Sequence, residues 1–144
     1  MGKQKSGPRL RPPTPQVSQQ MARMPTVGSG PEMAIRRELH SRGLRFRVAP
    51  CHLPGRPDLA FTRARLAVFV DGCFWHACPL HCSVPKSNRE WWIAKFTMTR
   101  ERDERKDAGL ASLGWSAIHI WEHDPVQTSC DWIEEEWRRR LAER

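Results

Sequence analysis

Five potential metal ligands lie within ten residues of one another near the middle of the chain. They are Cys73, His76, Cys78, His81 and Cys82. Cys73, Cys78 and His81 supply two thiolates and one imidazole, the ligand types that zinc prefers at tetrahedral geometry. A closed structural site needs a fourth ligand, and neighbouring residues such as His81 and Cys82 rarely both reach one ion. His123 is the better candidate, because it follows a predicted strand and strand ends lie close in space.

The spacing of these ligands matches no common zinc finger. A pocket of reduced cysteines with one hydrogen-bonded histidine therefore remains the alternative to a zinc site.

Two aspartates indicate a second kind of chemistry. Asp58 begins one predicted strand and Asp71 ends the next, so both are expected at one edge of the sheet. Magnesium prefers carboxylate and carbonyl oxygens and keeps some of its waters. Asp58 and the backbone carbonyl of Val70 form a candidate magnesium site, with His76 as proton acceptor for an attacking water. An aspartate in such a turn also fits a capping or salt-bridge role.

Two large aromatic residues, Phe74 and Trp75, lie between these ligands. Exposing them is costly unless something stacks on them. In a basic protein, insertion between base steps is a natural use, and burial in the core is the alternative.

The composition favours a polyanionic partner. The chain has 144 residues, a net charge of +8 at pH 7 and a pI near 9.9, which is typical of nucleic-acid-binding proteins. It has no apolar run long enough for a membrane helix and no signal peptide. Five cysteines, an odd number, favour a reducing compartment. We therefore expect a soluble cytoplasmic protein.

The pattern of apolar residues predicts one α/β domain with a mixed sheet and helices on its faces. Residues 1–18 are expected to form a disordered basic leader, residues 19–30 an arm that contacts DNA, and residues 31–144 the folded domain. Pro31 opens the first predicted helix and Gly43 ends it. The remaining predicted elements are strands 44–48, 59–61 and 66–70, helix 91–111, which Gly109 and Gly114 are expected to end, strand 115–121 and helix 132–141.

Several motifs occur in an order that resembles the very short patch repair endonucleases. The motifs are LPGRPD at 53–58, FVDGCFWH at 69–76, Trp91-Trp92, RERD at 100–103, Gly114-Trp115 and Trp121-Glu122. The resemblance covers residues 19 to about 125, and GCFWH together with LPGRPD is a specific signal.

The resemblance implies a fold like that of type II restriction enzymes (the PD-(D/E)XK type). It also implies a Mg²⁺-dependent nick in double-stranded DNA, 5′ of the thymine in a T:G mismatch left by deamination of 5-methylcytosine. Such an enzyme is expected to be a monomer in the bacterial cytoplasm near the nucleoid, functionally linked to a cytosine methyltransferase.

The resemblance also assigns roles to single residues. Asp58 and the carbonyl of Val70 would bind Mg²⁺, His76 would activate water, and Glu32 would support His76. Three intercalating side chains and four zinc ligands are also implied: Met21, Phe74 and Trp75, and Cys73, Cys78, His81 and His123. Asp71 stands where some members have histidine, and Thr99 where asparagine is common.

Two alternatives to a mismatch nickase remain open from the sequence. One is a restriction-type endonuclease of the same fold that cuts both strands of a matched site. The other is a zinc-containing DNA-binding module without catalysis, in which Asp58 and His76 only pack.

Overall fold

The computed structural model describes residues 14–16, 30–72 and 86–143. Their main elements are α2 (Gly30–Ser41), β1 (Arg47–Val48), β2 (Leu59–Phe61), β3 (Leu66–Asp71), α3 (Arg89–Ser112), β4 (Ser116–Trp121) and α4 (Val126–Ala142). The predicted order of helices and strands and the α/β class are confirmed. None of the described helices combines the length and apolarity needed to span a membrane.

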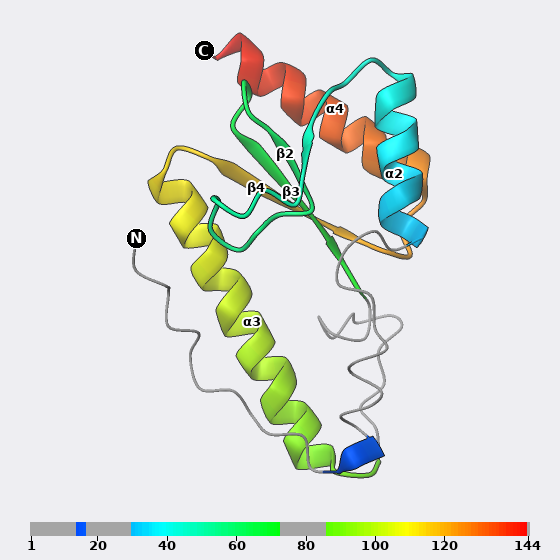
Figure 1. Ribbon diagram of the computed structural model, residues 1–144, viewed down its shortest axis with the longest axis vertical. Helices are drawn as coiled ribbons and strands as arrows, with labels where there is room; N and C mark the ends of the chain where they lie inside the picture. The colour runs from blue at the N-terminus through cyan, green and yellow to red at the C-terminus, as the bar shows by residue number, and fades with distance from the viewer. Residues whose placement is uncertain (1–13, 17–29, 73–85, 144) are drawn as a thin grey trace.

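The sheet is mixed, as predicted. Its four strands lie in the order β1-β2-β3-β4. β2 is antiparallel to both β1 and β3, whereas β4 runs parallel to β3. Because β3 and β4 are parallel, the chain must return along the sheet between them, and this connection contains the long helix α3. Figure 1 shows α3 on one side of the sheet and α2 with α4 on the other.

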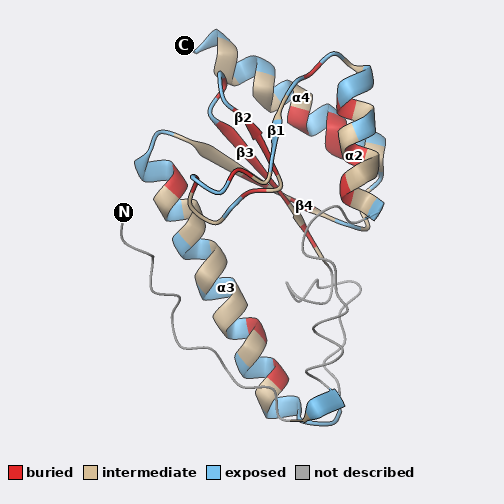
Figure 2. Cartoon of the chain, viewed as in Figure 1, coloured by how far each residue is buried: buried red, intermediate tan, exposed pale blue. Residues whose placement is uncertain are grey.

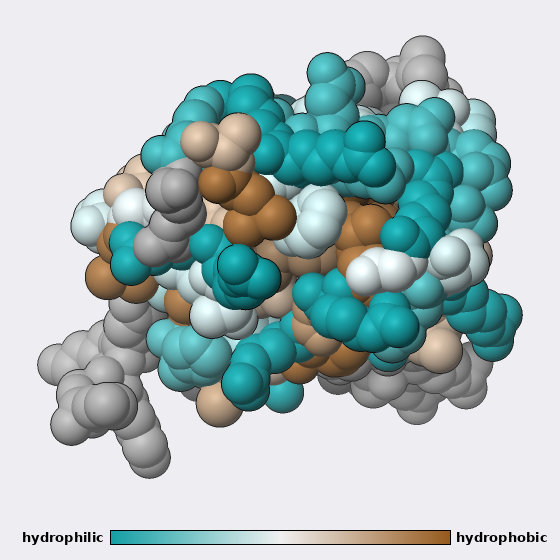
Figure 3. Space-filling model, turned by 90° about the horizontal axis from the view of Figure 1, so that it is seen from above, coloured by the Kyte–Doolittle hydropathy of each residue, from teal (hydrophilic) through white to brown (hydrophobic). Residues whose placement is uncertain are grey.

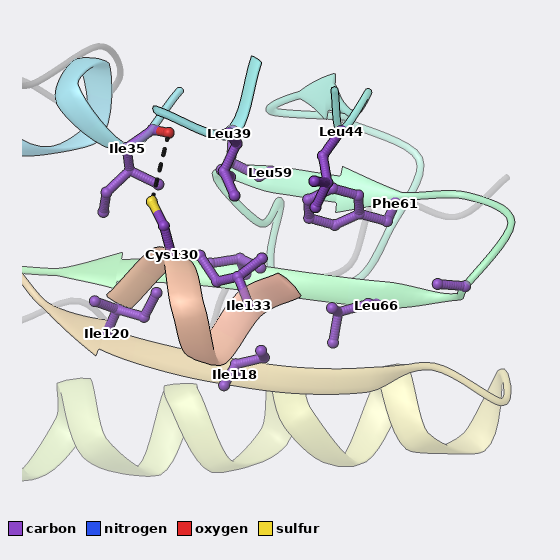
Figure 4. Close-up of a cluster of buried hydrophobic side chains, with 12 residues drawn as sticks. Ile35, Leu39, Leu44, Leu59, Phe61, Leu66, Ile118, Ile120, Cys130 and Ile133 are labelled. Atoms are coloured by element: carbon purple, nitrogen blue, oxygen red, sulfur yellow. Dashed lines mark hydrogen bonds between the residues drawn. The ribbon is translucent and has the colours of Figure 1, made fainter. Parts of the chain in front are cut away.

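Each face of the sheet buries its own apolar cluster, because successive side chains of a strand point to opposite faces. The larger cluster joins α2 and α4 to the even-numbered residues of β3 and β4 and includes Leu39, Val68, Ile118 and Ile133. Figure 4 shows side chains of this cluster, Leu39, Ile118 and Ile133 among them, meeting between the layers, with the Cys130 thiol directed at the carbonyl oxygen of Ile35. The smaller cluster joins Ala67 and Phe69 to Leu110 of α3. The two clusters account for most of the buried positions in Figure 2.

Helices α2 and α3 end in the same way. After α2, the N–H of Leu44 donates to the carbonyl of Leu39, and Gly43 adopts a φ of 84°. After α3, the N–H of Trp115 donates to the carbonyl of Leu110, and Gly114 adopts a φ of 81°. Glycine reaches this left-handed region without the cost of a Cβ atom. The predicted roles of Gly43 and Gly114 as helix ends are confirmed.

Three predicted boundaries were wrong. The first strand contains only Arg47 and Val48 rather than residues 44–48, because β2 offers a partner of only three residues. Helix α4 begins at Val126, before the predicted start at residue 132, because Val126 and the buried Cys130 pack its first turns against the core. The weak helical propensity of the short polar residues there hid this start from the sequence pattern. Gly109 does not end α3, which continues to Ser112.

Gly109 is needed for packing instead. A Cβ atom at this position would lie 3.1 Å from Cβ of Pro54. A Cβ atom at Gly55 would lie 2.7 Å from the Lys106 side chain of α3. Two glycines therefore let the loop that precedes Asp58 lie close against α3. This contact ties the position of Asp58 to the helix.

We predict that Gly55→Ala destabilises the protein more than Gly43→Ala. Both glycines have positive φ, 77° at Gly55 and 84° at Gly43, so both variants carry the strain of a left-handed alanine, roughly 1–2 kcal/mol. Only at Gly55 would the new methyl group also collide with Lys106, since nothing lies within 4 Å of the Cβ position at Gly43. Urea unfolding measures both losses, and equal losses would show that the loop can move away from α3 at no cost.

Candidate active site

Asp58 lies directly before β2, opposite the end of β3. Its carboxylate oxygen Oδ2 accepts a hydrogen bond from the backbone N–H of Val70 at 2.7 Å. The antiparallel register that pairs Leu59 with Val68 brings these residues together. The expectation that Asp58 and the end of the neighbouring strand share one edge of the sheet is confirmed.

The backbone carbonyl of Val70 faces the same side as its N–H. Asp71 uses its carbonyl to bind the N–H of Glu122 beyond β4, so the polar groups of the preceding residue point towards β2. If the register is continued from Leu59 and Val68, Pro57 stands opposite Val70. Proline has no N–H, so the ladder supplies no donor to this carbonyl. The Asp58 carboxylate therefore lies beside the Val70 carbonyl, which receives no hydrogen bond from the backbone of the strand opposite.

Glu32 approaches the same region from the first turn of α2. Its side chain is buried, with 2% of the residue exposed, and it forms an ion pair with Arg36 one helical turn later. The Nη1 atom of Arg36 also contacts Sδ of Met33 at 3.2 Å. Burial of a carboxylate is costly unless it is paired. Arg36 offsets that cost and holds Glu32 in place.

Asp71, at the end of β3, pairs with His119 of β4. Nδ1 of His119 lies 3.0 Å from Oδ2 of Asp71, and Nε2 lies 2.8 Å from Oδ2 of Asp107 on α3. The imidazole also stacks on Phe69, with ring centroids 4.8 Å apart. The pKa of His119 is raised from 6.5 to about 9, mainly by the hydrogen bond with Asp71 and against the effect of burial. His119 is therefore a cation at neutral pH.

The surroundings of Asp58 oppose its ionisation. Its carboxyl pKa is raised from 3.8 to about 6. Burial is the largest cause, and the negative charges of Glu32 and Asp71 add to it; the hydrogen bond from Val70 and the charge of Arg36 act in the opposite direction. Among the described residues, Glu32 and Asp71 each have a basic partner, whereas no basic side chain forms an ion pair with Asp58.

The described residues do not form a complete metal site by themselves. No three histidine, cysteine, aspartate or glutamate side chains in ranges 14–16, 30–72 and 86–143 gather closely enough to hold an ion. His123 lies just after β4, where its ring stacks on Trp121 and its Nε2 atom lies 3.4 Å from Asp124. The other predicted site residues lie outside the described residues: Met21, Cys73, Phe74, Trp75, His76, Cys78, His81 and Cys82.

Thr99, whose role the sequence leaves open, lies within α3. Its hydroxyl donates to the carbonyl oxygen of Lys95 at 3.0 Å, one turn earlier in the helix.

A pocket of about 410 Å³ lies away from Asp58, at the other end of β2. Arg45, Arg47 and Arg63 contribute to its lining, with Phe46 and Trp137 among its apolar walls. The face seen from above in Figure 3 is mostly hydrophilic, with hydrophobic side chains showing in a hollow near its middle. Neither Asp58 nor Val70 lines this pocket, so it is separate from the candidate active site.

Sequence reasoning missed the two counterions of this site. Arg36 lies four residues after Glu32, and this spacing places both side chains on one face of a helix. The spacing is the signal from which the ion pair could have been predicted. His119 occupies the face of β4 that points to α3, as the alternation of residues 115–121 predicts. Its contact with Asp107 depends on how α3 lies across the sheet, and no local pattern signals it.

Comparisons of the sequence with known proteins point to one family. Residues 14–83 match the family model of the DNA mismatch endonuclease Vsr. The chain is 42% identical to the type II nicking enzyme V.XorIIP of Xanthomonas oryzae over 104 residues, which cover 71% of this chain and 76% of that protein. It is 37% identical to the DNA mismatch endonuclease Vsr of Escherichia coli K12 over 108 residues, or 73% of this chain and 68% of that protein.

A third relative is the type II nicking enzyme V.NaeI of Lentzea aerocolonigenes, 38% identical over 105 residues, which cover 69% of this chain and 63% of that protein. Matches at this identity over most of both chains establish common descent. The chain belongs to the Vsr family of DNA mismatch endonucleases.

Proposed function

We propose that this protein is a Mg²⁺-dependent endonuclease that nicks one DNA strand 5′ of the thymine in a T:G mismatch. The observation that carries the proposal is the pair formed by Asp58 and Val70. The half-buried carboxylate of Asp58, which has no basic partner among the described residues, lies beside the Val70 carbonyl, which has no ladder donor, in a chain of the Vsr family. Both oxygens are of the type that Mg²⁺ prefers.

The names of the relatives support cleavage of a single strand. Two of the proteins compared above are named nicking enzymes and a third a mismatch endonuclease. This favours a nickase over a restriction-type enzyme that cuts both strands. It also favours catalysis over a zinc module that only binds DNA.

The residues of the site fit a magnesium ion. Magnesium commonly binds through one or two carboxylates, retained waters and phosphate oxygens of the substrate, so a cage of protein ligands is not needed. Asp58 and the carbonyl of Val70 would hold the ion. When bound, it supplies positive charge at the scissile phosphate and lowers the pKa of a bound water.

Two residues would handle the proton. His76 would accept it from the attacking water, and Glu32 would orient the imidazole of His76. The ion pair with Arg36 holds the Glu32 carboxylate in place, as an orienting acceptor requires. The basic charge of the chain, +8 at pH 7, would draw the duplex to the site.

Selection of the mismatch would rest on deformability. A T:G wobble pair stacks less well than a Watson–Crick pair, so inserting Phe74 and Trp75 from one groove and Met21 from the other costs less there. Deamination of 5-methylcytosine produces such pairs, which links the enzyme functionally to a cytosine methyltransferase. A structural zinc ion on Cys73, Cys78, His81 and His123 would hold the segment that carries the aromatic pair.

The first test of this proposal concerns the reaction itself. With Mg²⁺, the full chain should introduce a single nick 5′ of the thymine in a labelled duplex that contains one T:G pair in a CC(A/T)GG-like context. The matched T:A duplex, labelled on each strand, is the control. Cleavage of both strands of the control would favour the restriction-type alternative, and binding without any cleavage would favour the DNA-binding module.

The second prediction concerns Asp58→Asn, which should abolish nicking and yet stabilise the metal-free protein at pH 7. In the wild type, Asp58 ionises with a pKa of 3.8 when unfolded and about 6 when folded. The folded state therefore loses stability as the pH rises between these values, and the loss is complete at pH 7. Asparagine cannot ionise but can still accept the hydrogen bond from Val70.

Unfolding in urea with EDTA should show a gain on the order of 2–3 kcal/mol for Asp58→Asn at pH 7, shrinking towards pH 4. Added Mg²⁺ should stabilise only the wild type. Glu135→Gln, at an exposed position on α4, is the matched control and should change neither stability nor nicking. Mg²⁺-dependent nicking by Asp58→Asn would remove Asp58 from the metal site.

The third prediction concerns zinc. His123→Ala should lower the zinc content, measured by mass spectrometry of the purified protein, and lower its melting temperature, because a structural zinc contributes folding energy. The control is His52→Ala, which replaces an exposed histidine and should keep one equivalent of zinc. A full equivalent in His123→Ala would point to Cys82 as the fourth ligand.

A further inference from the structure

His119 connects three elements beside the candidate active site. Both of its ring nitrogens lie within 3.0 Å of carboxylate oxygens, those of Asp71 on β3 and Asp107 on α3. A neutral imidazole has one N–H and can donate to only one of them, whereas an imidazolium donates to both. The geometry therefore selects the charged ring, and its raised pKa of about 9 is consistent with this.

The end of β3 is held from two sides at this point. The carbonyl of Asp71 accepts from the N–H of Glu122 at 3.0 Å, and its side chain is bound to His119. Val70 comes directly before it and donates its N–H to Asp58 at 2.7 Å. Any rotation at Asp71 would turn the peptide that carries the Val70 carbonyl. The hydrogen bond between His119 and the Asp71 side chain restrains that rotation.

The positive charge of His119 also matters for Asp58. Asp71 is one of the two carboxylates whose charge acts on Asp58. The imidazolium balances Asp71, as Arg36 balances Glu32. Of the three carboxylates Asp58, Glu32 and Asp71, Asp58 is the one that has no basic partner among the described residues.

We propose that His119 is a positioning residue for DNA cleavage, which joins Asp71 to Asp107 and thereby sets the orientation of the Val70 carbonyl beside Asp58. This rests on the proposed nicking activity. His119 does not touch the reacting atoms in this role; it acts through the backbone of β3. Asp107, a half-exposed residue of α3, holds the other ring nitrogen of His119 and so fixes the imidazole from the side of the helix.

The test is steady-state nicking of the T:G duplex by His119→Gln, Asp107→Asn and His119→Arg. Glutamine carries both of its donors on one nitrogen, and its amide oxygen would face the second carboxylate, so it cannot bridge Asp71 and Asp107 as the imidazolium does. We therefore expect kcat to fall about 10–100-fold, while KM for the duplex should change less than about threefold. Asp107→Asn should show the same pattern with a smaller loss. Arginine carries several donors and can bridge both carboxylates, so His119→Arg should recover most of the rate.

The control is His40→Gln, at an exposed position on α2 where the ring contacts Phe46 and none of the described site residues. It should nick like the wild type. A wild-type kcat in His119→Gln, or a loss carried entirely by KM, would overturn the proposal. So would an arginine variant that folds as well as His119→Gln but is no faster. If His119→Gln does not fold, Asp107→Asn decides, because its position is on the surface.

A spectroscopic measurement separates this proposal from the proposed function. In ¹⁵N-histidine spectra at pH 7, His119 should show two protonated ring nitrogens, and this signature should weaken in Asp107→Asn. It does not depend on cleavage, so wild-type protein that nicks no duplex would refute the function and leave the network standing. A neutral His119 ring at pH 7 would refute the network.

Discussion

The register of β2 against β3 is the constraint on which the site depends. It is set by only three residue pairs, from Leu59–Val68 to Phe61–Leu66, all buried. A slip of one residue would turn every side chain of β2 to the other face of the sheet and remove Leu59 and Phe61 from the larger core cluster. The same slip would separate Asp58 from Val70. The register that packs the core is therefore the same register that places Asp58 beside Val70.

Glu32, Asp58 and Asp71 lie near one another, and their negative charges repel, but only two of the three carboxylates have a cationic partner among the described residues. Glu32 and Asp71 are each balanced by a cation, whereas Asp58 carries the cost of burial in its own raised pKa. A folded protein normally avoids such a group. Under the proposed function, this unbalanced charge would favour a divalent ion at Asp58, at the cost of stability in the metal-free protein.

The sequence predicts the order of elements, the faces of the strands and the meeting of Asp58 with the end of β3, because these follow from local apolar alternation and from antiparallel pairing. Gly109 shows where such reasoning fails. A glycine late in a helical stretch resembles a helix end, and only the contact with Pro54 explains why it lies inside α3. The bridge from His119 to Asp107 was likewise out of reach, because it depends on how a helix crosses a sheet.

Helix α3 is longer than its return path requires. Its 24 residues span about 36 Å, whereas the six residues of β3 span about 20 Å. Figure 1 shows the surplus at the N-terminal end of α3, projecting past the sheet on the side where β3 ends. The surplus of about 16 Å equals roughly five base-pair steps of duplex. Under the proposed function, this projecting stretch of α3 would give a bound duplex a longer flank of contact on the α3 side than the sheet itself provides.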